Sequence, residues 1–171
     1  MGLVPPCQVA LQGVEILTTF CEEEIAAMEE IENYKGDDET TPWANRASVA
    51  NVPFFGFIES KIAEVIPVLL ELLTKQEEGQ EEDPELWNLS KAGATCLGYV
   101  AQTVRDTIVW HVLPFINEHH QKQEWRYRDA AIVVFGSILV GPSVEQLKET
   151  ALRVMPYMLD SLKFPHAAVR N

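Results

Sequence analysis

Three proline-centred segments recur along the chain and constrain its fold more than any other feature. They read AEVIPVLLELLTK, WHVLPFINEHHQK and LRVMPYMLDSLKF, and they place Pro67, Pro114 and Pro156 at successive separations of 47 and 42 residues. Each proline lies within a pattern of apolar residues that has helical spacing. A proline inside a helix removes a backbone hydrogen bond and bends the axis, so its shared position predicts three helices of one shape.

A second type of segment follows each of the first two. WNLSKAGATCLGYVAQ begins at Trp87, and WRYRDAAIVVFGSILVG begins at Trp125, 38 residues later. Small residues occupy matching places in both, at 92–94 with Gly98 and at 130–131 with Gly136, and they predict close approach of neighbouring helices. A two-helix unit that recurs every 40–47 residues or so is typical of HEAT or armadillo solenoids. An ordinary helical bundle with similar helices is the alternative.

The apolar residues have helical spacing along most of the chain. In 58–76 they are Ile58, Ile62, Val65, Ile66, Leu69, Leu70 and Leu73, which predicts one buried stripe. In 144–163 they are Leu147, Ala151, Val154, Met155, Met158, Leu159 and Leu162. Because no comparable alternating run suggests a sheet, we predict an all-α protein, an α–α superhelix.

The repeat divides the chain into five parts. We expect a flanking helix at 1–32, a long loop at 33–57, a repeat at 58–104 with an acidic loop at 77–86, a second repeat at 105–141, and the start of a truncated repeat at 142–171. Solenoids need polar capping repeats, and neither end of the chain supplies one. We therefore expect a fragment of a longer solenoid.

The net charge of −13 comes from 26 acidic and 13 basic residues, and it is concentrated. Residues 22–39 and 77–85 together hold 15 of the 26 acids. This charge argues against direct binding to nucleic acid, whose phosphates need a basic surface, and it favours basic partners whose binding is sensitive to salt. The longest uncharged stretch is too short to span a bilayer, so no membrane insertion is expected.

The sequence gives little support to catalysis. The adjacent His119 and His120 point about 100° apart on a helix and do not form a metal pair. HExxH, GxSxG, a phosphate-binding glycine loop and calcium-loop spacing are all missing. We expect no enzyme activity, no metal and no cofactor. Cys7, Cys21 and Cys96 show no CxxC spacing and are interpreted as reduced thiols, with Cys96 a small buried hydrophobe.

An acidic run precedes Trp87 and is the main candidate for a binding site. Its carboxylates are Glu77, Glu78, Glu81, Glu82, Asp83 and Glu85. A solvated run without a partner is one interpretation. A basic segment would relieve the repulsion among these carboxylates, and the indole could stack on an arginine or on the stem of a lysine.

WRYRD at 125–129 opens the other helix of this second type. Its Arg126, Arg128 and Asp129, together with Lys91 in the preceding repeat, predict a ladder of ion pairs between neighbouring repeats. Contact with a partner on the inner surface of the solenoid is the alternative. PFFGF at 53–57 is interpreted as core packing or a hydrophobic staple rather than as an exposed patch.

These segments also carry a specific resemblance. The run WNLSKAGATCLGYV, followed by IVWHVLPFINEHHQKQEWRYRDAAIVVFGSILVGP, resembles the middle HEAT repeats of the importin-β (karyopherin-β1) family. VALQGVEIL and LLTKQEEGQEEDPELWN are similar to the same family, whereas 33–57 departs from its pattern. Gly79, Gln80 and Pro84 interrupt the acidic run, where animal members have nearly continuous aspartates.

The resemblance implies a nuclear import receptor of the cytoplasm, nucleus and nuclear pore. In that family the first helix of each repeat faces outward and the second lines a concave surface. The acidic loop contacts cargo and Ran-GTP, and the tryptophan after it contacts the basic segment of the importin-α adaptor. Phenylalanine-glycine nucleoporins bind between outer helices. Carried over, these roles fall on Trp87 and the six carboxylates before it. A HEAT scaffold subunit of another intracellular complex is the alternative.

Overall fold

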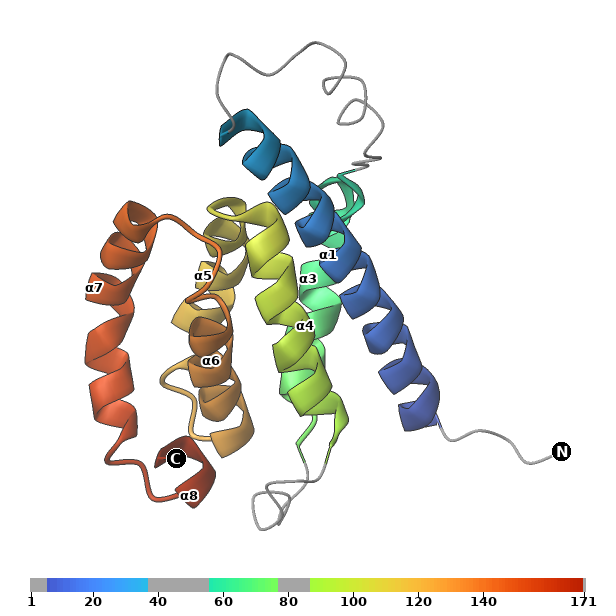
Figure 1. Cartoon of the computed structure of the whole chain (residues 1–171). Coiled ribbons are helices and arrows are strands. Elements are labelled where there is room, and N and C mark those ends of the chain that lie inside the picture. The colour runs from blue at the N-terminus through green and yellow to red at the C-terminus, as the bar shows by residue number, and fades with distance from the viewer. Residues whose placement is uncertain (1–5, 37–55, 77–86, 171) are drawn as a thin grey trace, which may run out of the picture.

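The computed structural model describes residues 6–36, 56–76 and 87–170, which form helices joined by turns. In chain order the helices are α1 (Pro6–Gly36), α3 (Phe57–Leu73), α4 (Leu89–Val104), α5 (Thr107–His119), α6 (Trp125–Ser137), α7 (Val144–Ser161) and α8 (Ala167–Arg170) (Figure 1). These three ranges contain no strand. The all-α prediction is therefore confirmed.

The helices with an internal proline follow one another in one layer. α3, α5 and α7 carry Pro67, Pro114 and Pro156, and α5 contacts both of the other two. In the second layer α1 contacts α4, α4 contacts α6, and α6 contacts α8. Because α3 also packs on α4 and α5 packs on α6, each predicted repeat is one pair of helices across the two layers. This is the arrangement of an α-solenoid.

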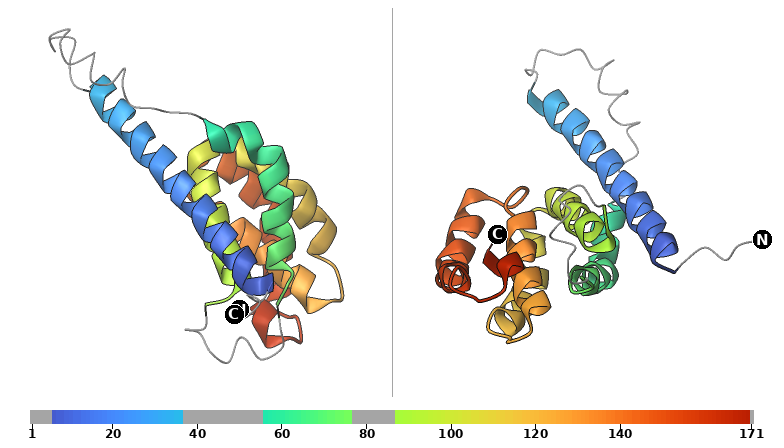
Figure 2. Two further views of the ribbon diagram at one scale, coloured as in Figure 1. Left: turned by 90° about the vertical axis from the view of Figure 1, so that its right-hand side faces the viewer. Right: turned by 90° about the horizontal axis from the view of Figure 1, so that it is seen from below.

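α1 is a long helix of 31 residues that lies alongside α4 and runs on beyond the other helices (Figures 1 and 2). It ends at Gly36, a residue type that commonly terminates helices. Residues 33–36 are therefore helical, and the predicted start of the long loop at 33 is wrong. The rest of that loop, at 37–55, lies outside the described residues.

The core lies between the two layers, and α3 supplies much of it. Six of the seven apolar residues predicted to form its stripe are buried, and Val65 is half-buried. In α7 the corresponding expectation is partly wrong. Val154 is buried, but Met155, Leu159 and Leu162 are 45%, 57% and 58% exposed. The long helix that packs against α7 is α5.

Small residues shorten the distance between helices at two of the predicted places. A Cβ added to Gly93 would lie 3.3 Å from Cδ1 of Leu73, and one added to Gly98 would lie 3.4 Å from the carbonyl oxygen of Ser137. At Gly136 the prediction is wrong, because this exposed glycine has nothing within 4 Å of an added Cβ. The matching glycines of the two repeats therefore differ in function.

The start of α3 is stabilised by a carboxylate from α1. Glu24 is buried, and its two oxygens accept hydrogen bonds from the backbone N–H groups of Phe57 at 2.5 Å and Ile58 at 3.3 Å. The first N–H groups of a helix have no partner within the helix, and the helix dipole favours a negative charge beside them. Gly56, at the N-cap, has a left-handed backbone with φ of 57° and no side chain to cap them. Glu24 therefore holds two repeats together.

The corner between α4 and α5 positions α7. Oδ1 of Asp106 accepts a hydrogen bond from the backbone N–H of Ser143 at 2.6 Å, and Oδ2 accepts one from the Ser143 hydroxyl at 3.0 Å. Gly141 has a φ of 121°, and a Cβ there would collide with the carbonyl of Ala101. Only glycine permits this close approach of the loop to the end of α4.

Candidate binding surface

The predicted acidic loop joins α3 to α4. Its carboxylates Glu77, Glu78, Glu81, Glu82, Asp83 and Glu85 lie outside the described residues. The chain enters this segment after Gln76 and leaves it at Trp87. α4 then begins at Leu89, and the side chain of Asn88 caps it by accepting a hydrogen bond from the backbone N–H of Lys91 at 2.9 Å. The loop therefore connects the two helices of one repeat.

Trp87 lies just outside α4 and is 51% exposed. It borders a groove between the two helices α1 and α4, with a volume of about 230 Å³. The other residues that line this groove are Val14, Glu15, Thr18, Thr19, Ala92 and Thr95. The lining is mostly small or apolar, and Glu15 is its single charged member. This groove suits an aliphatic stem that carries a positive charge at its end.

α1 gives the groove an acidic flank. Glu15, Glu22 and Glu23 of α1 are exposed. The Glu22 carboxylate accepts a hydrogen bond from the Tyr99 hydroxyl of α4, and this bond and the negative charge raise the pKa of Tyr99. Glu24, which the sequence grouped with these residues, is buried as the cap of α3. Glu15 therefore lines the groove, while Glu22 and Glu23 are exposed members of the predicted acidic cluster.

Arg126 and Asp129 connect the second repeat to the first. Oδ2 of Asp129 accepts a hydrogen bond from the Gln76 side-chain amide at 2.5 Å, and Nε of Arg126 donates to the backbone carbonyl of Gln76 at 2.7 Å. Gln76 is the last described residue before the acidic loop. Lys91 is half-buried in the first turns of α4. The WRYRD helix thus fixes the point at which the acidic loop leaves α3.

Arg128 makes contacts in the opposite direction, toward the third repeat. It is buried, its Nε donates to the carbonyl of Lys122 at 3.3 Å, and its guanidinium lies 4.4 Å from the ring centre of Phe164. Its Nη1 is 3.5 Å from the carboxylate of Asp160 at the end of α7. Arg126, Asp129 and Arg128 therefore join three successive repeats through polar contacts.

Trp125 occupies the place in the second repeat that matches Trp87, but it is only 8% exposed. Its ring stacks on His166, with ring centres 4.1 Å apart and planes within 4°. The guanidinium of Arg126 covers it at 4.6 Å. Trp125 is thus a packing residue between two repeats and is not available to a ligand.

A second groove, with a volume of about 460 Å³, lies between the proline helices α3 and α5. It is lined by Ile66, Pro67, Leu70, Glu71, Thr74, His111, Pro114, Phe115, Glu118, His119 and Tyr127. Phe115 stacks on the buried His119 at 4.1 Å, and Tyr127 lies 5.1 Å from the same ring. The sequence does not identify the residues of this groove, because the groove depends on two segments 47 residues apart in the chain lying side by side.

Among residues 6–36, 56–76 and 87–170, no cluster of three or more histidine, cysteine or acidic residues could hold a metal ion. In the same part of the chain, no helix combines the length and the apolar character needed to cross a membrane. Glu118 illustrates the surface charges: its pKa is lowered by its hydrogen bond to Lys122, at 3.1 Å. The features of the described surface that could bind a ligand are its grooves and its charged side chains.

Known relatives of this sequence are importins. The chain is 44% identical over 154 residues to importin subunit beta-1 of Arabidopsis thaliana, a match that covers 90% of the chain and 16% of the relative. It is 38% identical over 164 residues to importin subunit beta-1 of Schizosaccharomyces pombe, covering 96% and 18%. The chain therefore spans about a sixth of the length of these curated relatives. No family model matches the sequence.

Solved structures give the same result. Yeast importin-beta (Kap95p) superposes with a TM-score of 0.82 at 31% identity, over 96% of this chain and 17% of Kap95p. A Kap95:Nup1 complex superposes with a TM-score of 0.79 at 31% identity, over 97% and 17%. A structure of Kap95p bound to RanGDP gives 0.78 at 32% identity, over 97% and 18%.

Proposed function

We propose that this chain, which belongs to the importin-β family, forms the part of a nuclear import receptor that binds basic segments beside Trp87. Trp87 carries the proposal: it is half exposed, borders a groove, and lies two residues after a run of six carboxylates in nine residues. The carboxylates draw in an arginine- or lysine-rich segment, and the indole holds one of its side chains by a cation–π contact.

The ligands in this proposal are a basic nuclear-localisation segment or the importin-α adaptor, with Ran-GTP as the competing ligand. The structural relatives include Kap95p with RanGDP and with Nup1, and this likeness supports Ran and a nucleoporin as partners. A ligand that lowers the affinity for cargo must itself be bound less tightly when cargo is present, because the coupling is reciprocal. The receptor then operates in the cytoplasm, in the nucleus and at the nuclear pore, by binding and without catalysis.

The groove between α3 and α5 is the place we assign to a phenylalanine side chain of a nucleoporin. It lies in the layer of the proline-containing helices α3, α5 and α7, whereas Trp87 lies in the other layer. The floor of the groove combines aliphatic residues with Phe115. A ring inserted there would be shielded from water by Pro67 and Pro114. Basic cargo and nucleoporin would then occupy separate layers of the same repeats.

A HEAT scaffold of another complex is the alternative function. In a scaffold we expect the tryptophans to serve packing, as Trp125 does. A buried Trp87 would therefore have favoured the scaffold function. The exposure of Trp87 favours the receptor.

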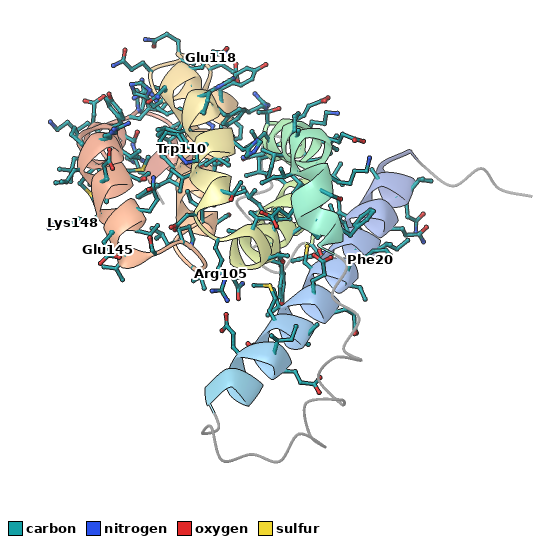
Figure 3. All side chains as sticks on the ribbon, turned by 90° about the horizontal axis from the view of Figure 1, so that it is seen from above. Phe20, Arg105, Trp110, Glu118, Glu145 and Lys148 are labelled. Carbon is teal, nitrogen blue, oxygen red and sulfur yellow. The ribbon has the colours of Figure 1, made fainter. Side chains whose placement is uncertain are left out.

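Titration with a basic peptide at two salt concentrations tests the proposal. A labelled arginine- and lysine-rich peptide should bind the chain at low salt and lose affinity as salt is raised. Trp87→Ala should weaken binding about tenfold, the effect of losing one cation–π contact of roughly 1.4 kcal/mol. Trp110→Ala is the matched control, because Trp110 is 67% exposed on α5, in the other layer (Figure 3).

Two outcomes would contradict the proposal. One is the absence of binding at low salt. The other is equal affinity of the Trp87→Ala variant and the unchanged chain, with helical content by circular dichroism the same in both.

A further inference from the structure

One polar side chain in the groove between α3 and α5 is nearly closed off from water. His119 is 7% exposed, and its side chain alone is 9% exposed. It lines the groove together with aliphatic residues of α3 and the rings of Phe115 and Tyr127. His119 lies five residues after the internal proline of its helix, a place that the buried Leu72 occupies in α3. α5 therefore puts an imidazole where a core leucine would pack.

The imidazole is held in one orientation. Its Nδ1 lies 2.8 Å from the backbone carbonyl oxygen of Phe115, one turn earlier in α5. A carbonyl oxygen only accepts, so Nδ1 carries the hydrogen of this bond. The ring also stacks on Phe115, with planes 19° apart, and its centre lies 5.1 Å from that of Tyr127. In the neutral imidazole, Nε2 is then a hydrogen-bond acceptor in a fixed position.

Nε2 of His119 has no donor within the described part of the chain. Apart from the bond at Nδ1, residues 6–36, 56–76 and 87–170 make no hydrogen bond to this ring. Oε1 of Glu118 lies 4.0 Å from Nε2, but a carboxylate only accepts, and this one is bonded to Lys122. Because Glu118 also lines the groove, Nε2 lies toward the groove. Nε2 of His120 is enclosed, whereas Nε2 of His119 is not.

This acceptor affects which aromatic ring fits the groove. A ring that enters displaces water from Nε2 of His119, and a phenylalanine ring has no donor to replace that water. The acceptor would then be covered without a partner, which is unfavourable. A tyrosine ring has the same flat body and a hydroxyl at its tip that can donate. A fixed acceptor should therefore distinguish the two rings, although they differ by one oxygen atom.

We propose that the groove between α3 and α5 binds a tyrosine side chain in preference to phenylalanine, with Nε2 of His119 accepting the hydrogen bond of the phenol hydroxyl. The ligand is a segment of a partner protein that presents an exposed tyrosine. The groove volume of about 460 Å³ lies within the range of ligand pockets. This inference rests on the proposed insertion of an aromatic ring into the groove, and it makes phenylalanine the weaker of two ligands.

The charges of the groove restrict the ligand further. Among the described residues that line it, Glu71 and Glu118 are carboxylates and none is a lysine or an arginine. Each of the two carboxylates is paired with a lysine one turn later, Lys75 at 2.7 Å and Lys122 at 3.1 Å, so these lysines are already neutralised. A phosphate on the tyrosine would remove the donor and add negative charge beside the carboxylates. Phosphorylation of the ligand should therefore prevent binding.

The affinities of two matched peptides test the inference. Both peptides are rich in glycine and serine, and they differ only in carrying a single phenylalanine or a single tyrosine. The 171-residue chain is titrated at pH 8.5, above the range in which histidine usually titrates. NMR follows the titration, because it measures weak binding and locates it on α3 and α5. The chain should bind the tyrosine peptide about fivefold more tightly, the effect of one hydrogen bond. The phosphotyrosine peptide should show no binding.

Two variants show whether His119 causes the preference. His119→Phe keeps a flat ring and removes the acceptor, and the two peptides should then bind with affinities within about twofold of each other. His119→Leu introduces the residue type found at the matching place in α3, and it should lose the preference in the same way. Circular dichroism checks that both variants keep their helical content. A role of His119 in packing alone would change both affinities by one factor and leave their ratio unchanged.

The outcomes separate this inference from the proposed function. Equal affinities of the two peptides for the unchanged chain would overturn the preference for tyrosine and leave the aromatic groove in place. A preference that persists in both variants would overturn the role of His119, and phosphotyrosine binding as tight as tyrosine binding would overturn the role of a phenol donor. If neither peptide binds at α3 and α5, this inference and the assignment of the groove to a nucleoporin both fail. The binding of basic peptides beside Trp87 is measured independently.

Discussion

Trp87 and Trp125 occupy matching positions in two successive repeats, yet one is 51% exposed and the other 8%. The difference comes from the side chains that surround each indole. His166 stacks on Trp125, and the Arg126 guanidinium covers it. Trp87 instead borders an open groove between α1 and α4. The same position in a repeat can therefore serve packing in one copy and binding in the next.

The largest expected effect is the loss of packing at Trp125. Trp125→Ala should lower the free energy of unfolding by about 3 kcal/mol, because it leaves a cavity against His166. Trp87→Ala should change it by less than about 1 kcal/mol, because half of that side chain already faces water. Urea denaturation followed by circular dichroism measures both values. Equal destabilisation by the two substitutions would remove the distinction between these tryptophans.

Arg128 lies three residues after Trp125, and Ser90 lies three residues after Trp87, so these two residues also occupy matching positions in the two repeats. Arg128→Met should cost about 2 kcal/mol, because the buried guanidinium contacts both Phe164 and Asp160. Ser90→Ala should cost less than about 1 kcal/mol, because the hydroxyl makes one long hydrogen bond of 3.4 Å to the Leu73 carbonyl. The measurement is the same urea titration. A more stable Arg128→Met chain would show that this arginine is kept for a partner rather than for the fold.

A smaller effect is expected at the contact between Gln76, the last described residue before the acidic loop, and Asp129 of the second repeat. Gln76→Ala and Asp129→Ala should show a coupling of about 1 kcal/mol in a double-mutant cycle, since their side chains are 2.5 Å apart. Asp129→Ala should also weaken binding of a basic peptide more than Ser90→Ala does, because it releases the end of the loop. Additive effects on stability would exclude direct coupling between the two side chains.

Much of the fold could be predicted from the sequence, because it depends on local patterns. Apolar spacing and the three prolines predict the helices and their pairing into repeats. Outcomes that depend on a distant neighbour could not be predicted. The glycines at 98 and 136 look alike, but only Gly98 has a backbone close by. The stripe of α7 looks like that of α3, but three of its residues are exposed.

The candidate site divides in the same way. The acidic run and Trp87 are visible as composition, and the resemblance to importin-β gives them a role. The groove beside Trp87 and the capping of α3 by Glu24 each need two helices that are far apart in the sequence. No local pattern encodes these contacts, because each partner alone has an ordinary structural explanation.

The most direct test of the difference between the two tryptophans is fluorine NMR of the chain labelled with 5-fluorotryptophan. Trp87→Phe and Trp125→Phe variants assign the two resonances. Addition of a tryptophan-free basic peptide at low salt should shift the Trp87 resonance and leave the Trp125 resonance in place, and added salt should reverse the shift. A bound peptide that moves the Trp125 resonance while the Trp87 resonance stays fixed would contradict this assignment.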